Sequence, residues 1–437
     1  MQFTDQASRS RLNREFHSRP PIPLHGSAMV THVACLRDQG QDERERGHFQ
    51  VLASALGASI EQPAPELAIL YSDKRCVRWE RHTEFSSYTF FHMEITDAAP
   101  FWQQAPMAGV PAGWLDNLPG EMLVACCIEM RRQAVDDEAA LISQFAGDGR
   151  QMVVSRAVDG AAWIAADFLF GGDSPWGDAF SRFVLINDGM TPRQAGRTVQ
   201  RLIEIETYRL FALLGLPVAR ELGQWIRGAE STLADLTGRI EAANGLKDEH
   251  AVLNTLSALS AEVERIHATT GFRFGASEAY HALVRQRIGE LREERVPGFP
   301  TFSEFMERRL TPPMATCQSM RARLKQLSSG LARSSALLRA RVDVGLEQQN
   351  QALLQQMNQR NKLQFQLQET VEGLSVIAMT YYGSQLVHHM AAGMEAKGWH
   401  VSPEVAAAVA VPLIAGMLYW RLRVQRTRLH RALVKGD

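Results

Sequence analysis

Residues 371–421 read VEGLSVIAMTYYGSQLVHHMAAGMEAKGWHVSPEVAAAVAVPLIAGMLYWR, and this stretch decides how the C-terminal part of the chain folds. It contains two mainly apolar segments, Val371–Met394 and Val405–Trp420, which are separated by a short loop rich in turn residues. A helix of about 20 apolar residues is long enough to cross the hydrocarbon layer of a membrane. The stretch therefore predicts a two-helix transmembrane hairpin. Its helices are expected at 371–394 and 405–421, and its outer loop at 395–404.

The residues around this hairpin indicate its orientation. Arg360 and Lys362 precede the first segment, and the second ends in Tyr419-Trp420 followed at once by Arg421 and four further arginines. Lys and Arg collect on the cytoplasmic side of membrane proteins, whereas Tyr and Trp collect at the membrane interface. We therefore expect both chain ends and the bulk of the chain on the cytoplasmic side, with residues 422–437 as a basic cytoplasmic tail.

The composition limits the class of protein. The chain has 47 Lys+Arg against 48 Asp+Glu, a net charge of −1, so no basic excess points to nucleic acid as a partner. A mean hydropathy of −0.19 excludes a polytopic membrane protein. The expected partner is the lipid bilayer. The alternative is a buried helical hairpin in a soluble protein, which the alanine-rich stretch Val405–Ala415 would also suit.

A long stretch without helix breakers precedes the hairpin. From Thr316 to Thr370 the only glycines are Gly330 and Gly345, and apolar residues recur at spacings of three and four. This pattern predicts a coiled-coil-like stalk helix over 316–370 that continues into the first membrane helix. Because such a helix is not stable alone in water, it needs partners from earlier helices or from other subunits. The apolar positions are Leu324, Leu327, Leu331, Leu338, Val342, Leu346, Leu353 and Met357.

The rest of the chain divides near residue 190. Residues 1–190 contain short apolar runs between frequent Pro and Gly residues, which predicts a mixed α/β cytoplasmic domain. From Thr191-Pro192, a plausible helix N-cap with proline at the first helical position, residues 191–315 form a helical section. The fold class is therefore α+β, with an N-terminal mixed domain, a helical middle section, a stalk helix and the membrane hairpin.

The densest polar cluster reads Arg78-Trp79-Glu80-Arg81-His82-Thr83-Glu84-Phe85 and falls in the run 77–95, which we expect to be extended. Side chains alternate along a strand, so Glu80, His82 and Glu84 would share one face. Two carboxylates beside an imidazole suit a divalent cation or an acid/base pair, and with Arg81 they form a candidate polar cluster or metal site. The favoured alternative is a structural salt-bridge ladder with neighbouring arginines.

A second polar pattern lies in the helix that begins at Thr191. Glu206 falls on the apolar stripe of this helix, where a lone carboxylate is costly and needs a partner. Arg201, Arg209 and the strand residue Arg81 are the candidate partners. We favour a buried ion-pair network that fixes the helix against the sheet. Its expected members are Arg197, Arg201, Glu204, Glu206, Tyr208 and Arg209.

Other groups suggest binding rather than catalysis. His17 and Arg19 form a candidate anion-binding pair, and His388-His389 could bind a cation near the outer face of the membrane. The chain contains no HExxH, GxSxG, P-loop or GxGxxG motif, and its five cysteines form no CxxC pair. We therefore assign no catalytic residue, and the one cofactor that the polar groups suit is a divalent cation.

Several longer motifs are distinctive. They are Phe16-His17-Ser18-Arg19-Pro20-Pro21, the run from Trp79 to Phe85, Gly196-Arg197 through Ala219-Arg220, Glu304 to Leu310, Gln349-Asn350, Thr370 to Ser375, and Tyr381-Tyr382. Together they resemble a family of uncharacterised membrane-anchored bacterial proteins, domain-of-unknown-function family 3422. The resemblance covers nearly the whole chain. It implies anchorage in the bacterial cytoplasmic (inner) membrane and no established activity.

The order of the segments is also similar to that of CorA-type magnesium transporters. A cytoplasmic α/β domain, a helical section and a stalk helix precede two membrane helices and a basic tail. Those transporters carry Gly-Met-Asn at the outer end of the first membrane helix, where this chain has Gly393-Met394-Glu395. Because glutamate replaces the asparagine, the cation selectivity of that family cannot be carried over.

Two functions are compatible with these patterns, and an enzyme is the least favoured class. The first is a homo-oligomeric ion channel or transporter whose first membrane helices line a pore. The second is a membrane-anchored binding or scaffold protein whose cytoplasmic domain recognises a ligand or partner. The candidate pore-lining residues are Ser375, Met379, Tyr382, Gln385 or Leu386, His389, Gly393, Met394 and Glu395.

Overall fold

A computed structural model covers the chain and describes residues 9, 12, 20–37, 40–72, 74–93, 95, 101, 107, 109–111, 113–146, 152–168, 180–243, 245–396, 400 and 402–433. The chain divides into two compact units. The first consists of Met1–Ala242 and Val252–Ser335, and the second of Ala243–Ala251 and Ala336–Asp437. Each unit is described by itself below.

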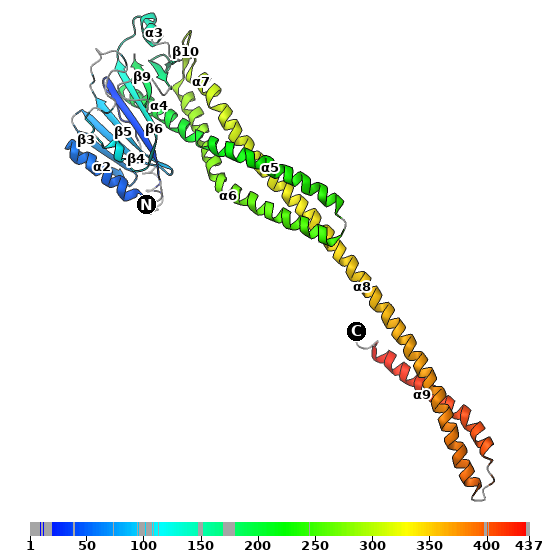
Figure 1. Cartoon of the computed structure of the whole chain (residues 1–437). Helices are drawn as coiled ribbons and strands as arrows, with labels where there is room; N and C mark the ends of the chain where they lie inside the picture. Colours follow the sequence, from blue (N-terminus) through cyan, green and yellow to red (C-terminus); the bar gives the residue numbers. More distant parts are fainter. Residues whose placement is uncertain are drawn as a thin grey trace, which may run out of the picture. The chain divides into compact units, whose positions relative to one another are not determined.

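The first unit is built on a ten-stranded mixed sheet with the order β10-β7-β8-β9-β6-β1-β5-β4-β3-β2 (Figure 1). Within the described residues, β6 and β9 pair in parallel and the other neighbouring strands pair antiparallel. The strands are β1 Ala28–Leu36, β2 Ser59–Ala64, β3 Leu67–Ser72, β4 Arg75–Arg81, β5 Phe85–Met93, β6 Glu121–Arg132, β7 Val153–Ala157, β8 Ala162–Asp167, β9 Ser181–Asn187 and β10 Glu294–Arg295.

The helices follow the sheet in the order that the sequence predicts, with shorter helices inserted between strands. They are α2 Asp42–Leu56, α3 Glu138–Ala146, α4 Pro192–Leu213, α5 Gly215–Ala242, α6 Leu246–Leu291, α7 Phe302–Arg309, α8 Thr311–Glu395 and α9 Pro403–Leu433, with a 3-10 turn at Leu115–Asn117. The prediction of an N-terminal mixed domain followed by a long helical section is therefore confirmed.

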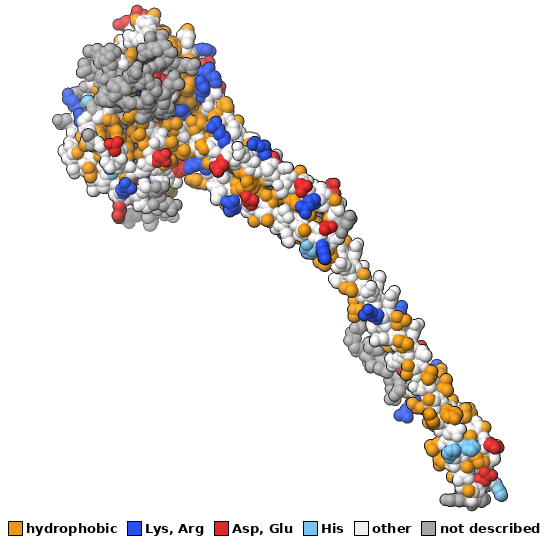
Figure 2. Space-filling model, in the orientation of Figure 1, with side chains coloured by type: hydrophobic (Ala, Val, Ile, Leu, Met, Phe, Trp, Pro, Cys, Tyr) orange, Lys and Arg blue, Asp and Glu red, His pale blue; other side chains and the backbone are white. Residues whose placement is uncertain are grey.

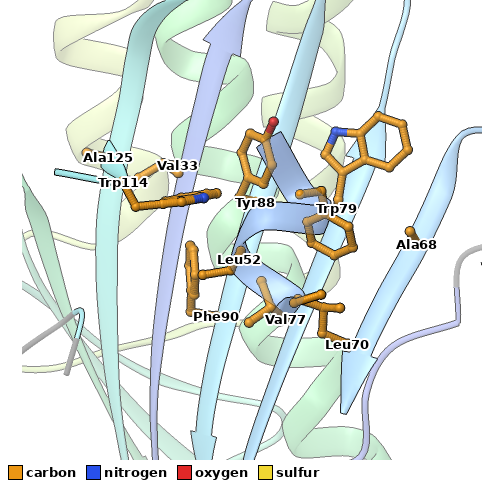
Figure 3. Packing of buried hydrophobic residues seen from close by; sticks show 12 residues of the cluster. Val33, Leu52, Ala68, Leu70, Val77, Trp79, Tyr88, Phe90, Trp114 and Ala125 are labelled. Carbon is orange, nitrogen blue, oxygen red and sulfur yellow. The ribbon is translucent and has the colours of Figure 1, made fainter. Parts of the chain in front are cut away.

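Helix α2 covers one face of the sheet. Its Phe49 and Leu52 pack against aromatic and aliphatic side chains of β4 and β5, among them Trp79, Tyr88 and Phe90 (Figure 3). Burying side chains of this size contributes roughly 1.5–3 kcal/mol each, which makes this cluster a main source of the stability of the unit. The rings of Tyr88 and Trp114 meet edge to face with centroids 5.2 Å apart, an arrangement that aromatic pairs favour.

Helix α4 covers the opposite face. Thr191 caps this helix: its side chain accepts a hydrogen bond from the backbone N–H of Gln194, and the Gln194 side chain accepts one from the Thr191 backbone N–H. Because side chains alternate along β1, Ala34 faces α4 while its neighbour Val33 faces α2. The sequence prediction of a helix that starts with Thr191-Pro192 is confirmed.

The prediction that residues 77–95 form one extended run is wrong. The run is a hairpin in which β4 ends at Arg81 and β5 begins at Phe85. The His82 N–H donates to the Phe85 carbonyl and closes the turn at 2.8 Å. The run contains no Gly or Pro to mark this turn, so the alternation of side chains breaks where the sequence gives no signal.

Helices α5, α6 and the first part of α8 pack together within the first unit. Trp225 of α5 donates its indole N–H to Glu262 of α6 at 3.0 Å, and Glu230 of α5 pairs with Arg323 of α8 at 2.5 Å. Gly330 of α8 allows a close approach of α5, because a Cβ there would lie 3.0 Å from a methyl of Leu233. The earlier helices are thus the partners of α8 over this part of its length, as one of the two predicted alternatives requires.

The second unit contains the rest of α8 and the whole of α9. α8 runs unbroken to Glu395, so the predicted stalk and the segment 371–394 belong to one helix. Within the described residues, Pro403–Arg421 of α9 is the one helical stretch long and apolar enough to cross a membrane, with 19 residues and a mean hydropathy of 1.5. The prediction of two such spans is wrong, because Gln, His and Glu side chains lower the hydropathy of 371–394.

Candidate functional site

A row of buried polar side chains crosses the sheet beneath α4. His32 of β1 is paired in register with Thr89 of β5, which is paired with Arg78 of β4. The Thr89 hydroxyl lies 2.9 Å from His32 Nδ1, and the Thr207 hydroxyl of α4 lies 3.2 Å from Nε2. Because the Thr207 hydroxyl donates to the Ile203 carbonyl, it is free to accept from Nε2–H, which makes Nδ1 the acceptor for Thr89. The ring thus links the sheet to α4.

The electrostatics of this row keep His32 neutral. Burial, together with the positive charge of Arg78, lowers the pKa of His32 from 6.5 to about 3. A histidine held in this state is a hydrogen-bonded spacer rather than an acid or base near neutral pH. The row is enclosed between the sheet and α4, so a substrate has no direct access to it.

Glu206 lies at the end of the same row and is fully buried. Its carboxylate accepts hydrogen bonds from the Arg209 guanidinium at 2.6 and 2.9 Å and from the Ser181 hydroxyl of β9 at 2.6 Å. Arg209 is thus the one of the three candidate arginines that contacts this carboxylate, and Ser181 is a partner that the sequence missed. Burial raises the pKa of the neighbouring Cys126 thiol, and the negative charge of Glu206 adds to this increase.

Two further ion pairs join α4 to α6. Arg201 pairs with Glu290 at 3.0 Å, and Glu204 pairs with Arg287, which also contacts Glu290 at 2.9 Å. These groups are half-buried, and the partners of Arg201 and Glu204 lie on α6 rather than among the residues predicted for the network. Arg197, the remaining predicted arginine, has an exposed side chain.

The β4–β5 turn is linked to α6 in the same way. Glu84 pairs with Arg273, and its carboxylate also accepts a hydrogen bond from the Tyr280 hydroxyl. Burial and the charge of Glu84 raise the pKa of Tyr280. Tyr280 in turn stacks on Tyr208 of α4, with ring centroids 5.6 Å apart. The turn, α4 and α6 are therefore held by one connected set of contacts.

The other members of the predicted polar cluster point to different partners. Glu80 pairs with Arg78 at 3.0 Å, and Arg81 pairs with Asp42 of α2 at 2.7 Å. His82 lies in the turn rather than on a strand face. No set of three His, Cys, Asp or Glu side chains suited to a metal occurs within the described residues. Glu80, Arg81 and Glu84 are therefore engaged in separate ion pairs with β4, α2 and α6.

A cleft of about 560 Å³ lies between the end of α6, β10 and α7. Its floor is apolar, and several arginines stand on its rim. Arg292 pairs with Asp159 at 2.9 Å and Arg295 with Glu304 at 3.1 Å. Glu293 accepts hydrogen bonds from the first backbone amides of α7. Arg292, Arg295 and Glu293 are thus each engaged by other groups of the protein.

The candidate pore-lining residues all lie on α8, and all of them except Ser375 are exposed. α9 packs against α8 at Gly383, where a Cβ would come within 3.0 Å of an Ile414 methyl. Tyr382 is 71% exposed and lies about 100° around the helix from Gly383. Met379, four residues before Gly383, is its neighbour on the helix surface and is 57% exposed. Figure 2 shows hydrophobic side chains gathered over this end of α8 and α9, with histidines among them. The candidate anion pair of His17 and Arg19 lies outside the described residues.

Several residues of these networks carry no signal in the sequence. His32, Ser181 and Arg273 come from elements far apart in the chain, and none belongs to a repeated or spaced motif. The row of strand neighbours places His32 and Ser181 on either side of Cys126, and α6 brings Arg273 to Glu84 of the β4–β5 turn. Glu206 is the residue whose position in the sequence predicts part of these networks. A carboxylate on an apolar helical face requires a buried partner, but the sequence does not identify that partner.

Comparison with known proteins supports the family resemblance. No curated protein matches the chain. A family model matches residues 4–429, which is nearly the whole chain and includes the sheet, the helical section and the apolar part of α9. This match gives no support to the expected similarity to CorA-type transporters. The chain belongs to the family described as protein of unknown function, DUF3422.

Proposed function

We propose that this protein is a membrane-anchored homo-oligomer whose copies form an ion pathway along the C-terminal end of α8. The anchor is α9. Its apolar stretch ends in Tyr419-Trp420 and continues into Arg421 and Arg423, the order of residues typical of a membrane interface on the cytoplasmic side. Inner-membrane location with the sheet domain in the cytoplasm follows from this orientation.

The contact between α8 and α9 carries the proposal. Because Gly383 lies against Ile414, the end of α8 lies beside α9 wherever α9 is placed. If α9 crosses the membrane, the polar side chains of Gln385, His388 and His389 enter it too. Polar groups at this depth are costly unless they face other protein or water. The end of α8 is too polar to face lipid on all sides, whereas α9 can face lipid. This arrangement suits an assembly in which α8 forms the inner layer and α9 the outer one.

The outward face of α8 fits such an inner layer. The residues at 375, 379, 382, 386, 389 and 393 share a stripe at helical spacing, and a different stripe contacts α9. Around a symmetry axis this face would present hydroxyl, thioether, phenol and imidazole groups. The carboxylate of Glu395 at the far end of α8 would give the entrance a negative charge that attracts cations.

The test is ion flux measured on the full-length protein. Detergent-purified protein is first sized by mass, and a symmetric species of four or more copies is expected. Liposomes that contain the protein should then pass Mg²⁺ or K⁺ faster than empty liposomes. A monomer or dimer, or an oligomer without flux, would contradict the ion pathway and favour the anchored binding protein.

A matched pair of variants locates the pathway. Tyr382→Ala alters the proposed inner face, whereas Tyr381→Ala changes the same type of side chain about 100° around the helix. We expect the first to change flux several-fold and the second to leave it near the wild-type value. Equal effects would show that this face does not line the path.

A further inference from the structure

The stripe on α8 does not end where the helix leaves α9. Starting from Gly393 and moving back by three or four residues, one straight line on the helix surface reaches Leu346. Its members are Leu346, Asn350, Leu353, Met357, Asn361, Gln364, Gln368, Val371, Ser375, Met379, Tyr382, Leu386, His389 and Gly393. All of them except Ser375 are exposed. The spacing averages about 3.6 residues, the repeat of a straight α-helix. We call this line the α8 stripe.

The α8 stripe carries no Asp, Glu, Lys or Arg. The stretch from 346 to 393 contains five such residues, and each lies off the stripe. They are Glu347, Arg360, Lys362, Glu369 and Glu372. A solvated helix face in a chain with 22% charged residues would be expected to include charges at this length. A face without them, made mainly of apolar and amide side chains, is typical of a surface that another protein covers.

Within the part of the second unit that the structure describes, neither neighbour of α8 covers this stripe beyond the half-buried Ser375. The α5–α6 turn contacts α8 at Gly345, where a Cβ would lie 3.4 Å from Leu246, and Arg341 pairs with Glu249 at 3.6 Å. Further along the helix, α9 contacts the face of Gly383. Leu353 and Met357, which belong to the stripe, are 58% and 60% exposed.

We infer that copies of this chain meet in parallel and in register along the α8 stripe, from Leu346 through the segment beside α9. The inference rests on the proposed function and names its association surface. Parallel, in-register contact places each side chain next to its own counterpart. Identical charges would then repel, whereas Leu, Met, Asn and Gln pair with themselves through packing and amide hydrogen bonds. A shared membrane topology gives the copies the same orientation.

The occupant is a second copy rather than another protein for the same reason. A different protein can be selected by complementary charges, so a stripe that binds one would be expected to carry charged residues. A stripe free of charge over the whole of this length is what a self-contact in register requires. The straight repeat also differs from the 3.5-residue repeat of a two-stranded supercoil, so helices that converge on an axis without coiling fit it better.

Cysteine cross-linking of the full-length protein in membranes tests the inference. Leu353→Cys and Gln364→Cys lie on the stripe. Gln355→Cys and Gln366→Cys, each two residues further on, lie about 160° around the helix and are equally exposed. The five native cysteines are buried, which keeps their background low. Under mild oxidation the stripe variants should form disulfide-linked dimers at least several-fold more than their controls.

Charge insertion provides a second measurement. Leu353→Glu should lower the mass of the detergent-solubilised oligomer, and Gln355→Glu should leave it unchanged. Equal cross-linking of both sets, or equal masses of both glutamate variants, would overturn the inference. If the wild-type protein is still oligomeric in that case, the proposed self-association stands and only this surface is wrong. A monomeric wild-type protein would overturn both.

Discussion

Gly383 of α8 lies directly against Ile414 of α9, so that a Cβ on the glycine would come within 3.0 Å of the isoleucine Cδ1. This contact is the closest approach that glycine makes possible between the two helices. Gly373, two to three turns earlier on α8, has no atom within 4 Å of the same position. Comparing the same substitution at these two glycines therefore separates its effect on helix packing from its effect on helix propensity.

Gly383→Leu should weaken the packing of α9 on α8. Inserting a branched side chain where no space exists costs typically 1–3 kcal/mol, although glycine to leucine improves helix propensity. We expect the α8–α9 segment of the variant to be cleaved faster by protease in detergent. Gly373→Leu is the control and should be cleaved at or below the wild-type rate. Equal protection of both variants would show that the α8–α9 contact is not close.

Removing the partner of the buried Glu206 carboxylate should destabilise the first unit strongly. Arg209→Met leaves this carboxylate with the Ser181 hydroxyl alone, and breaking a buried pair from one side costs roughly 3–5 kcal/mol. The thermal midpoint of the full-length protein should fall by several degrees.

The exposed pair of Arg292 and Asp159 gives the matching control for that variant. Its atoms lie 2.9 Å apart, but both side chains are more than half exposed. Exposed pairs contribute about 0–1 kcal/mol, so Asp159→Asn should leave the thermal midpoint nearly unchanged. A larger fall for Asp159→Asn than for Arg209→Met would contradict the assignment of the network.

His32 should make stability depend on pH in the acid range. Its folded-state pKa is about 3, below the unfolded value of 6.5, so the unfolded chain binds a proton more readily. Stability is then fully present above pH 6.5 and is lost as the pH falls towards 3, by about 1.4 kcal/mol per pH unit. His32→Gln should have a shallower slope of unfolding free energy between pH 6 and 4. Identical slopes would mean that His32 titrates normally in the folded protein.

The cysteine thiols should be unreactive in the folded protein. Burial raises the pKa of Cys35, Cys76 and Cys127 to about 12, and all five cysteines are buried and free of disulfides. A thiol reagent at pH 8 should label less than one thiol per native chain and all five after denaturation. Rapid labelling of a native thiol would place that residue at a surface that opens in solution.

Local signals made the helices predictable. Thr191-Pro192 marks the start of α4, and Thr301 caps α7. Such caps can be read from the sequence because their hydrogen bonds involve only residues within one helical turn. The stretch without helix breakers after Thr316 predicts α8. This helix is continuous because no residue that usually ends a helix interrupts it. The same local reasoning overestimated 371–394, because its length suited a membrane span while its polar side chains did not.

The sheet depends on contacts between distant residues. The parallel pairing of β6 with β9 and the turn at 82–84 have no local mark, because strand partners are chosen by packing on both faces. The partner of Glu206 was predicted to be an arginine, since a buried carboxylate requires a counter-charge. Ser181 joined it only because β9 lies beneath α4.

The sequence by itself therefore determined the order of the segments, the helical second half, the apolar C-terminal helix and the need for an ion pair at Glu206. Each depends on free energies set within a few turns of helix or by the polarity of a single stretch. The tertiary structure decided the strand order, the link from His32 to Thr207 and the face of α8 that α9 covers. These depend on which distant surfaces pack together, and that choice is made only when the whole chain buries its apolar area.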